Sequence, residues 1–316
     1  MPLADAGLTA WSWNPLTDIQ VMWSYPFMVN AFRAGAVIAV LSAAVGWFVV
    51  LRRQTFAAHT LAVVGFPGAS GAVLVGVASG YGYFAFCLAA AVVIAMLPGA
   101  GQGHGEESAL IGTVQAFLLA CGFLFVALYK GFLGGVDALL FGSFLGIGDG
   151  QVVLLAVVAV VVLAVLAAVG RPLLFASVDP SVAAARALPV RALSVVFLVL
   201  LGAATAEASQ ITGSLLVFAL LVMPPATAQL LSPRAAVSLP LGMLIGLAVT
   251  WLGLTAAYYS PYPVGFFVTT FAFSAYVLAR AARTAATAFG ARGARGPRPG
   301  TGATGGTPHA VEEAAA

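Results

Sequence analysis

QVVLLAVVAVVVLAVLAAVG, at residues 151–170, is an uncharged run in which only Gln151 is strongly polar. The hydrocarbon core of a bilayer is about 30 Å thick, so a spanning helix needs about 20 mostly apolar residues. The run therefore predicts a membrane-spanning helix. Charged residues and clusters of Gly and Pro divide the rest of the apolar sequence into further runs of this length. The nine predicted spans are 29–51, 58–79, 82–98, 109–129, 151–170, 191–207, 211–231, 235–257 and 263–283.

The composition of the whole chain leads to the same fold class. Of the 316 residues, 62% are hydrophobic and 7% are charged, whereas about 25% are charged in an average soluble domain. So few polar side chains cannot cover a water-facing surface of this size, which excludes a soluble fold. Cys87 and Cys121 lie inside apolar runs and indicate neither a disulfide framework nor a cysteine metal site. We expect an all-α, polytopic integral membrane protein.

The basic residues predict the orientation of the chain, because Lys and Arg collect in the cytoplasmic loops of membrane proteins. With the N-terminus outside, only Arg33 and Lys130 of the 13 Lys and Arg residues fall on the outer side. This distribution supports an odd number of spans. We therefore expect a multi-pass protein of the plasma membrane with an extracytoplasmic N-terminus and a cytoplasmic C-terminus.

The chain divides into three parts and contains one irregular segment. Residues 1–24 carry Trp and Pro and suit an extracytoplasmic or interfacial position, and residues 25–283 form the transmembrane domain. Residues 284–316 are mostly Ala, Gly, Thr, Pro and Arg, which predicts a disordered cytoplasmic tail. Residues 132–148 are rich in Gly and interrupted by Asp137, so we expect a re-entrant or interfacial element there and not a tenth span.

The sequence contains no motor of its own. A nucleotide-hydrolysing chain needs a phosphate-binding loop such as G-x-x-x-x-G-K-[ST], and the one lysine, Lys130, lies in YKGFLGG. Ion-coupled carriers usually keep ionisable groups near the bilayer midplane, whereas most of the acids here fall in loops or tails. The pattern indicates a pore-forming subunit driven by a separate ATPase. An ion-coupled carrier or a channel remains the alternative from another class, and an integral membrane enzyme is disfavoured because no span carries a cluster of His and acids.

Several segments resemble, in the right order, the permease subunits of the zinc/manganese ABC importers, a family with the architecture of the cobalamin permeases. The likeness covers residues 26–283. The segments that carry it are PFMVNAFRAG at 26–35, GWFVVLRRQTF at 46–56, FPGASG at 66–71, LLFGSFLGI at 139–147, VDPSVAAARALPVR at 178–191 and TGSLLVFALLVMPPATAQLLS at 212–232. The resemblance implies the fold of a type II importer permease.

The segment 178–191 reads as a short cytoplasmic helix. Asp179 is placed to cap its N-terminus and Pro180 suits its first turn. In importers of this type such a helix contacts the ATPase, so the resemblance implies that Ser181 through Leu188, with Ala184, form the contact and that Arg186 pairs with an acid of the ATPase. An ordinary helical loop between spans is the alternative.

The seventh predicted span contains two adjacent prolines. Pro224 and Pro225 remove two backbone donors, which predicts a kink or an unwound turn in the middle of the membrane. Such a break either lines a transport path or is a structural kink. Gly242 and Gly246, one helical turn apart in the next span, favour close contact between helices.

The candidate metal ligands depart from the pattern of the family that the chain resembles. Its second span opens with an Asp followed four residues on by a His, whereas this chain has His59 and Val63 at those positions. An ionisable residue inside a membrane is by default a functional hypothesis, so His59 is the first candidate for the transport path. Glu207, expected near the outer end of its span, and Asp137 follow. His104 with Glu106 and Glu107 is interpreted as part of a solvated turn.

The sequence thus predicts the permease of an ABC importer for a divalent transition metal, with zinc or manganese as cargo and no permanently bound cofactor. The resemblance implies a homodimer in membrane lipid, a cytoplasmic ABC ATPase and an extracytoplasmic metal-binding protein, with no nucleic acid partner. The altered His59/Val63 pair keeps a second cargo open, such as a metal chelate.

Overall fold

A computed structural model describes residues 20–96, 105–129, 142 and 146–293. The expected interfacial segment 1–24 and tail 284–316 lie largely outside these residues, as do Asp137 and His104. The described part is helical throughout. Its helices are α2 (Pro26–Leu51), α3 (Thr55–Leu74), α4 (Ser79–Met96), α5 (Gly105–Leu128), α7 (Asp149–Val178), α8 (Pro180–Ala185), α9 (Val190–Leu231), α10 (Ala235–Tyr258) and α11 (Val264–Gly293).

Eight helices in the described part are long and apolar enough to cross a membrane, and Leu216–Leu231 is a shorter apolar helix. Together they correspond to the nine predicted runs, so the all-α polytopic fold is confirmed. Seven of the runs correspond to α2, α3, α4, α5, α7, α10 and α11, although α7 and α11 extend eight and ten residues beyond the C-terminal ends of their predicted runs. Residues 284–293, expected to be disordered, are therefore helical. A further difference from the sequence prediction lies in α9, which joins the runs 191–207 and 211–231.

The helix α9 reverses direction at Gly213. Its 42 residues would be about 63 Å long if straight, twice the thickness of the membrane core. Gly213 has φ 73° and ψ 160°, a backbone conformation that is essentially restricted to glycine. Ser194, before the reversal, and Gln229, after it, both bond to the C-terminal part of α2. The two halves of α9 therefore run side by side in opposite directions.

This reversal lies close to the predicted boundary between the spans 191–207 and 211–231, and it is separate from the break expected inside the second of these spans. We expected an interruption at Pro224 and Pro225, but the backbone remains helical through both prolines, and the non-helical dihedral angles occur at Gly213. Both prolines are buried, and Cβ atoms built at Gly242 and Gly246 of α10 would lie 3.3 Å from Pro225 Cα and 3.7 Å from Pro224 Cβ. The predicted close helix contact at these two glycines is confirmed: here α10 packs against the part of α9 that contains Pro224 and Pro225.

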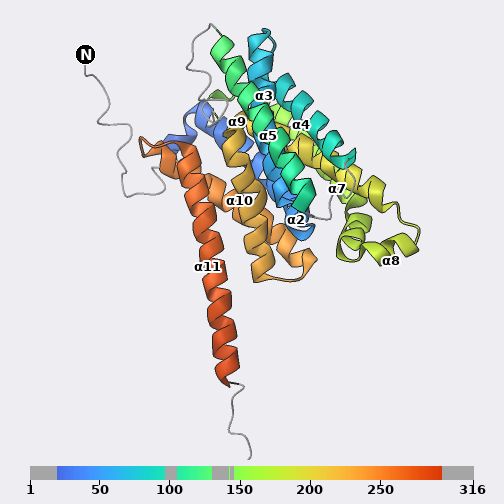
Figure 1. Cartoon of the computed structure of the whole chain (residues 1–316). Helices are drawn as coiled ribbons and strands as arrows, with labels where there is room; N and C mark the ends of the chain where they lie inside the picture. Colours follow the sequence, from blue (N-terminus) through green and yellow to red (C-terminus); the bar gives the residue numbers. More distant parts are fainter. Residues whose placement is uncertain (1–19, 97–104, 130–141, 143–145, 294–316) are drawn as a thin grey trace, which may run out of the picture.

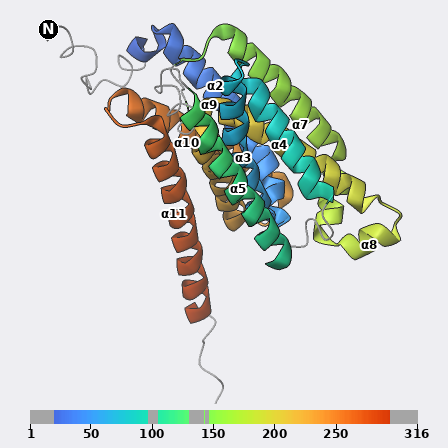
Figure 2. The same ribbon diagram turned by 45° about the horizontal axis from the view of Figure 1, so that its top comes forward.

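The helices α2 and α9 form the centre of the bundle, and the others surround them (Figures 1 and 2). A Cβ atom at Gly46 of α2 would lie 1.8 Å from the carbonyl oxygen of Leu221, so the second half of α9 packs directly on the α2 backbone. The helix α5 packs on α3, and α11 projects beyond the bundle (Figure 1).

The described residues of the segment 132–148 contact α2 and α9. Gly142 has φ 82°, and a Cβ atom there would lie 2.2 Å from the carbonyl oxygen of Ile211 and 2.7 Å from the nitrogen of Gly213. Asn30 of α2 donates from Nδ2 to the carbonyl oxygen of Ile147 at 3.2 Å. The segment therefore reaches the reversal of α9, while the structure describes only Gly142 and residues from 146 on within it.

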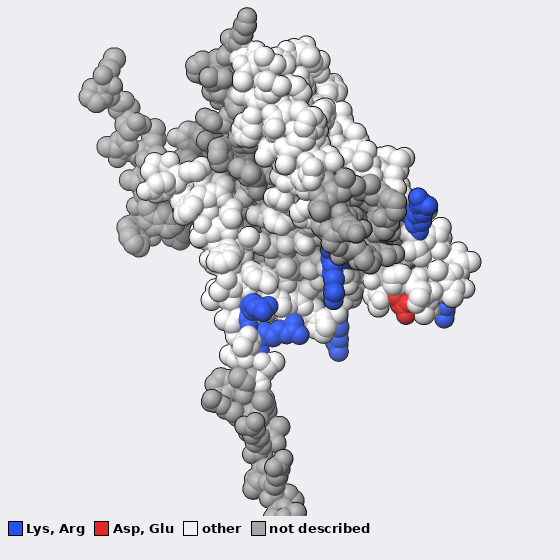
Figure 3. Space-filling view, in the orientation of Figure 1, with Lys and Arg blue, Asp and Glu red and all other residues white. Residues whose placement is uncertain are grey.

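Arginines gather at the end of the bundle from which α11 projects (Figure 3). We call this the arginine-rich end and define it by Arg52, Arg53, Arg234 and Arg283. Arg283 of α11 donates to the carbonyl oxygen of Leu230 at the end of α9, which fixes this part of α11 beside the end of α9. The arrangement agrees with the clustering of basic residues on one side in the sequence.

Candidate functional site

The candidate transport path is centred on His59, which lies in the first turns of α3. Its imidazole packs edge to face on the ring of Phe218, with centroids 5.0 Å apart. Phe218 belongs to the half of α9 that follows the reversal, so the return of the chain at Gly213 brings the two rings together. The Nδ1 atom of His59 is buried and has no hydrogen-bond partner in the described part of the chain. It remains free to bind a proton donor or a metal ion.

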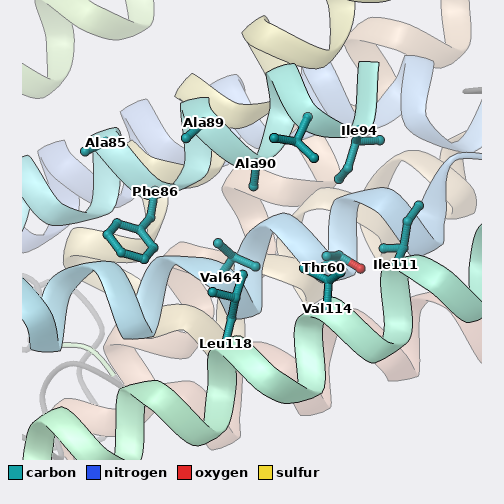
Figure 4. Close-up of a pocket in the computed structure, with 11 residues that line it drawn as sticks. Thr60, Val64, Ala85, Phe86, Ala89, Ala90, Ile94, Ile111, Val114 and Leu118 are labelled. Atoms are coloured by element: carbon teal, nitrogen blue, oxygen red, sulfur yellow. The ribbon is translucent and has the colours of Figure 1, made fainter. Parts of the chain in front are cut away.

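The neighbours of His59 on α3 are not further ligands. Val63, one turn later, is 8% exposed and apolar. Thr60 donates a 2.8 Å hydrogen bond to Oε1 of Gln115 on α5, so both of these polar side chains are already paired. Thr60 also borders an apolar cavity of about 580 Å³ between α3, α4 and α5, where Phe86 and Leu118 lie at one end and Ile94 and Ile111 at the other (Figure 4).

Glu207 lies in the first half of α9, six residues before the reversal. We expected it near the outer end of its span, and within the bundle its side chain is completely buried. Neither carboxylate oxygen has a hydrogen-bond partner among the described residues. Ala206, next to it, packs with Tyr83 and Cys87 of α4 and with Ala69 of α3. Glu207 is thus a polar group held inside the helix bundle.

The described candidates, His59 and Glu207, do not form a metal site with other described residues of the chain. Among the described residues there is no group of three or more His, Cys, Asp or Glu side chains able to hold a metal ion. No described hydrogen bond joins His59 to Glu207. Asp149 is exposed in the first turn of α7. Because a zinc ion usually has four ligands, one imidazole alone is not a closed binding site.

The predicted cap of the short helix α8 is present. Asp179 accepts a hydrogen bond from the backbone nitrogen of Val182 at 3.0 Å and from the hydroxyl of Ser181 at 2.7 Å, and Pro180 occupies the first helical position. These bonds, that of Ser181 first, hold the pKa of the Asp179 carboxyl below its ordinary value. The helix ends at Ala185, three residues before the Leu188 boundary expected from the sequence.

The outer surface of α8 is formed by small side chains together with Val182, which is 41% exposed. Ser181, Ala184 and Ala185 are exposed, whereas Ala183 faces inward and is fully buried. The guanidinium of Arg186 lies over the ring of Phe175 of α7, 5.8 Å from its centroid. Within the described chain Arg186 is therefore stacked on an aromatic ring, and no acid is paired with it.

Arg52 connects three helices at the arginine-rich end. Its guanidinium donates to Oγ of Ser177 on α7 at 3.0 Å and to Oγ of Ser194 on α9 at 2.6 Å. It also lies 5.3 Å from the centroid of the Phe197 ring. Burial among these groups lowers the pKa of Arg52. The first of the paired arginines seen in the sequence is thus a structural link, and the exposed Arg53 is not part of it.

Sequence reasoning missed the residues that set the geometry of the path. Gly213, Gly142 and Gly46 enable the reversal of α9 and its close packing on α2, yet a glycine in an apolar run gives little signal by itself. One signal was available, because an apolar stretch of twice the spanning length has to turn. The predicted span boundary between 207 and 211 lies next to Gly213, a residue type that tolerates the required backbone angles.

The structure defines a polytopic helical membrane protein. His59 and Glu207, the candidates for the transport path, lie inside its bundle, and the short helix α8 lies at its arginine-rich end. The family model for the ABC 3 transport family matches residues 24–283. The chain belongs to this family, and it is a permease subunit, the non-catalytic membrane component of an ABC importer for metal ions.

Characterised relatives align over most of the chain. The manganese import system permease protein ScaB of Streptococcus gordonii is 27% identical over 242 residues, which are 76% of this chain and 85% of that protein. The chelated iron transport system membrane protein YfeC of Yersinia pestis is 28% identical over 237 residues, which are 75% of this chain and 80% of that protein.

Solved structures show the same fold. The structure of PsaBC from Streptococcus pneumoniae in complex with Fab aligns with a TM-score of 0.75 at 24% identity, covering 84% of this chain and 94% of that chain. A chain of an ABC transporter in an inward-facing conformation aligns with a TM-score of 0.67 at 17% identity, covering 86% and 91%. The fold is that of a type II importer permease, as expected from the sequence.

Proposed function

We propose that the chain transports a divalent transition metal ion, manganese or zinc, as a homodimer whose alternating access is driven by a separate ABC ATPase. The proposal of a metal ion as cargo rests on one observation, the unpartnered Nδ1 of His59 in the first turns of α3. Imidazole suits zinc and other borderline divalent ions. One imidazole leaves most coordination positions open, so a second copy of the chain, backbone carbonyls or water supply the remaining ligands.

The relatives support both a free metal ion and a related cargo. ScaB is named for manganese import and YfeC for chelated iron transport. Val63 supports a chelated metal as cargo. It stands where the family pattern has a ligating His, so the ion site loses a ligand and becomes less selective. A chelate that carries its own ligands needs fewer from the protein. A metal chelate is therefore the second candidate.

The arrangement at the arginine-rich end supports a position for the ATPase. We propose that this end is cytoplasmic, in agreement with the distribution of Lys and Arg, and that α8 is the contact for the ATPase. The capped helix exposes Ser181, Ala184 and Ala185, whose small side chains permit close approach of a partner. A metal-binding protein would deliver the cargo at the opposite, extracytoplasmic end.

Metal uptake tests the cargo directly. Manganese, zinc and iron are measured by elemental mass spectrometry in cells that lack the gene, in cells with the gene restored, and in cells with His59→Ala, all grown in metal-limited medium. We expect one metal to fall on deletion and to be restored by the intact gene but not by His59→Ala. The matched control is His309→Ala, which changes a histidine of the C-terminal segment and should restore uptake.

Three other results of the uptake experiment would favour a different cargo or a different class of transporter. Unchanged metal content on deletion would reject uptake of a metal ion under these conditions. Uptake that needs a chelator in the medium would favour the chelate. Transport that persists without the ATPase would instead support an ion-coupled carrier or a channel.

The contact with the ATPase is tested by Ala184→Glu, which places a charge on the exposed side of α8. We expect loss of ATPase assembly and of uptake, because an unpaired charge at a closely packed contact is costly. Ala285→Glu, on the exposed face of α11, is the matched control and should leave both unchanged. Assembly that survives Ala184→Glu would show that α8 is not the contact.

A further inference from the structure

A second apolar cavity lies away from His59, on the other side of the bundle centre. Its volume is about 470 Å³, and it lies between α7 and α10 with α2 as its floor. Leu163, Leu166 and Leu174 line it from α7, Leu239 and Met243 line it from α10, and Phe48 belongs to the floor. The volume falls within the range of small-molecule sites in proteins, about 300–1,000 Å³.

The depth of this groove matches one leaflet of a bilayer. From Leu163 to Leu174 the helix α7 rises by about 16 Å, which is about half of the hydrocarbon thickness. Both walls carry apolar side chains at helical spacing over this depth. The groove thus has the length and the chemistry of a site for a lipid acyl chain.

One end of the groove is cationic. Arg171, the one charged residue in its lining, is exposed and makes no hydrogen bond or ion pair with other described residues. Ala235 and Ala236 line the groove from the first turn of α10, and no side chain caps this helix N-terminus. Backbone N–H groups at an uncapped helix start favour an anion, especially phosphate. Arg234, which precedes them, adds a second exposed cation nearby.

The floor of the groove is fixed in place. The indole Nε1 of Trp47 donates to Oγ of Ser238 on α10 at 2.9 Å, and Gln229 donates to the carbonyl oxygen of Trp47 at 2.8 Å. Trp47 therefore has its polar atoms satisfied within the protein and presents an apolar surface to the groove. Arg171 and the start of α10 remain as the polar groups available to a ligand.

We propose that the groove binds an anionic glycerophospholipid of the leaflet at the arginine-rich end, with one acyl chain along Leu163–Leu174 and the headgroup phosphate at Arg171 and the first turn of α10. This leaflet is cytoplasmic in the orientation proposed above. Basic pockets between transmembrane helices on the cytoplasmic side are typical sites for anionic headgroups. A free phosphate ion would leave the apolar groove unfilled, so the lipid is the occupant that uses both parts of the site.

The test measures lipid retention by the purified full-length chain in detergent, using native mass spectrometry with phosphatidylglycerol and phosphatidylcholine of identical acyl chains. We expect phosphatidylglycerol to be preferred about fivefold, because one basic residue near a membrane surface contributes about that factor to anionic binding. Arg171→Gln should remove this preference. Gly170→Leu should weaken both lipids, since a Cβ atom at Gly170 meets only Phe48, at 3.9 Å, and the longer side chain would enter the groove.

Arg280→Gln is the matched control, because it removes an exposed arginine of α11 that does not line the groove. Thermal unfolding of each variant shows that the fold is retained. Equal retention of both lipids by the unmodified chain would overturn the role of the headgroup, and unchanged retention by Arg171→Gln and Gly170→Leu would overturn the site itself. Absence of the lipid from the chain assembled with its ATPase would show that a protein surface covers the groove.

Discussion

The guanidinium of Arg52 donates a 2.6 Å hydrogen bond to the hydroxyl of Ser194, joining the end of α2 to the start of α9. The same side chain reaches Ser177 of α7. A single residue therefore links α2 to α7 and α9, the two helices that flank α8 in the sequence. This link predicts that Arg52 contributes to the stability of the arginine-rich end.

Replacement of Arg52 by Lys should destabilise the permease by about 2 to 3 kcal/mol. Hydrogen bonds of a charged group contribute about 1.5–3 kcal/mol each, and an ammonium cannot reproduce the two-sided contact of a planar guanidinium. Thermal unfolding of the purified protein measures the effect. Arg53→Lys, at the exposed neighbouring position, is the control and should be neutral. Equal stability of the two variants would contradict the structural role of Arg52.

The reversal of α9 should depend on glycine at position 213. A Cβ atom would be strained at φ 73° and ψ 160°, at a cost of about 1–3 kcal/mol. Gly142 is packed against the same turn, so Gly142→Ala should act in the same direction. We expect Gly213→Ala and Gly142→Ala to lower both the unfolding temperature and metal uptake. Gly150→Ala, where no atom lies within 4 Å of an added Cβ, should change neither.

Close packing between α2 and the second half of α9 should tolerate no side chain at Gly46. An added Cβ would lie 1.8 Å from the carbonyl oxygen of Leu221, and the backbone would have to move. Overpacking of this kind costs about 1–3 kcal/mol or more. We expect Gly46→Ala to reduce the yield of folded protein in size-exclusion chromatography. Gly170→Ala, whose Cβ would make an ordinary contact at 3.9 Å, is the control, and an equal yield of both variants would contradict the packing argument.

Glu207 offers a test that separates transport from stability. Glutamine keeps the size of the side chain and removes the cost of burying a charge, which is several kcal/mol for an unpaired ion. We expect Glu207→Gln to retain or raise thermal stability while metal uptake falls severalfold. Ser209→Ala changes a neighbouring buried side chain that is also unpartnered, and it should preserve uptake. Unchanged uptake in Glu207→Gln would remove Glu207 from the transport path.

The sequence by itself determined the fold class, because 62% hydrophobic residues and runs of spanning length leave only a helical membrane bundle. It also determined the cap of α8, since Asp179 and Pro180 act on their own neighbours along the chain. Both conclusions depend on local composition or on contacts within a few residues. For this reason they needed no knowledge of how the helices pack.

Only the tertiary structure decided how the two halves of α9 pack and which polar groups meet. The chain turns at Gly213, close to the predicted boundary between the spans 191–207 and 211–231, and Gly142 packs against this turn. Pro224 and Pro225, where a break was expected, stay helical against the glycines of α10. The contact of His59 with Phe218 follows from that turn, and the burial of Glu207 and the links made by Arg52 follow from the packing of the helices around it. They depend on which helices lie side by side, and the apolar spans are too similar in composition to specify their neighbours.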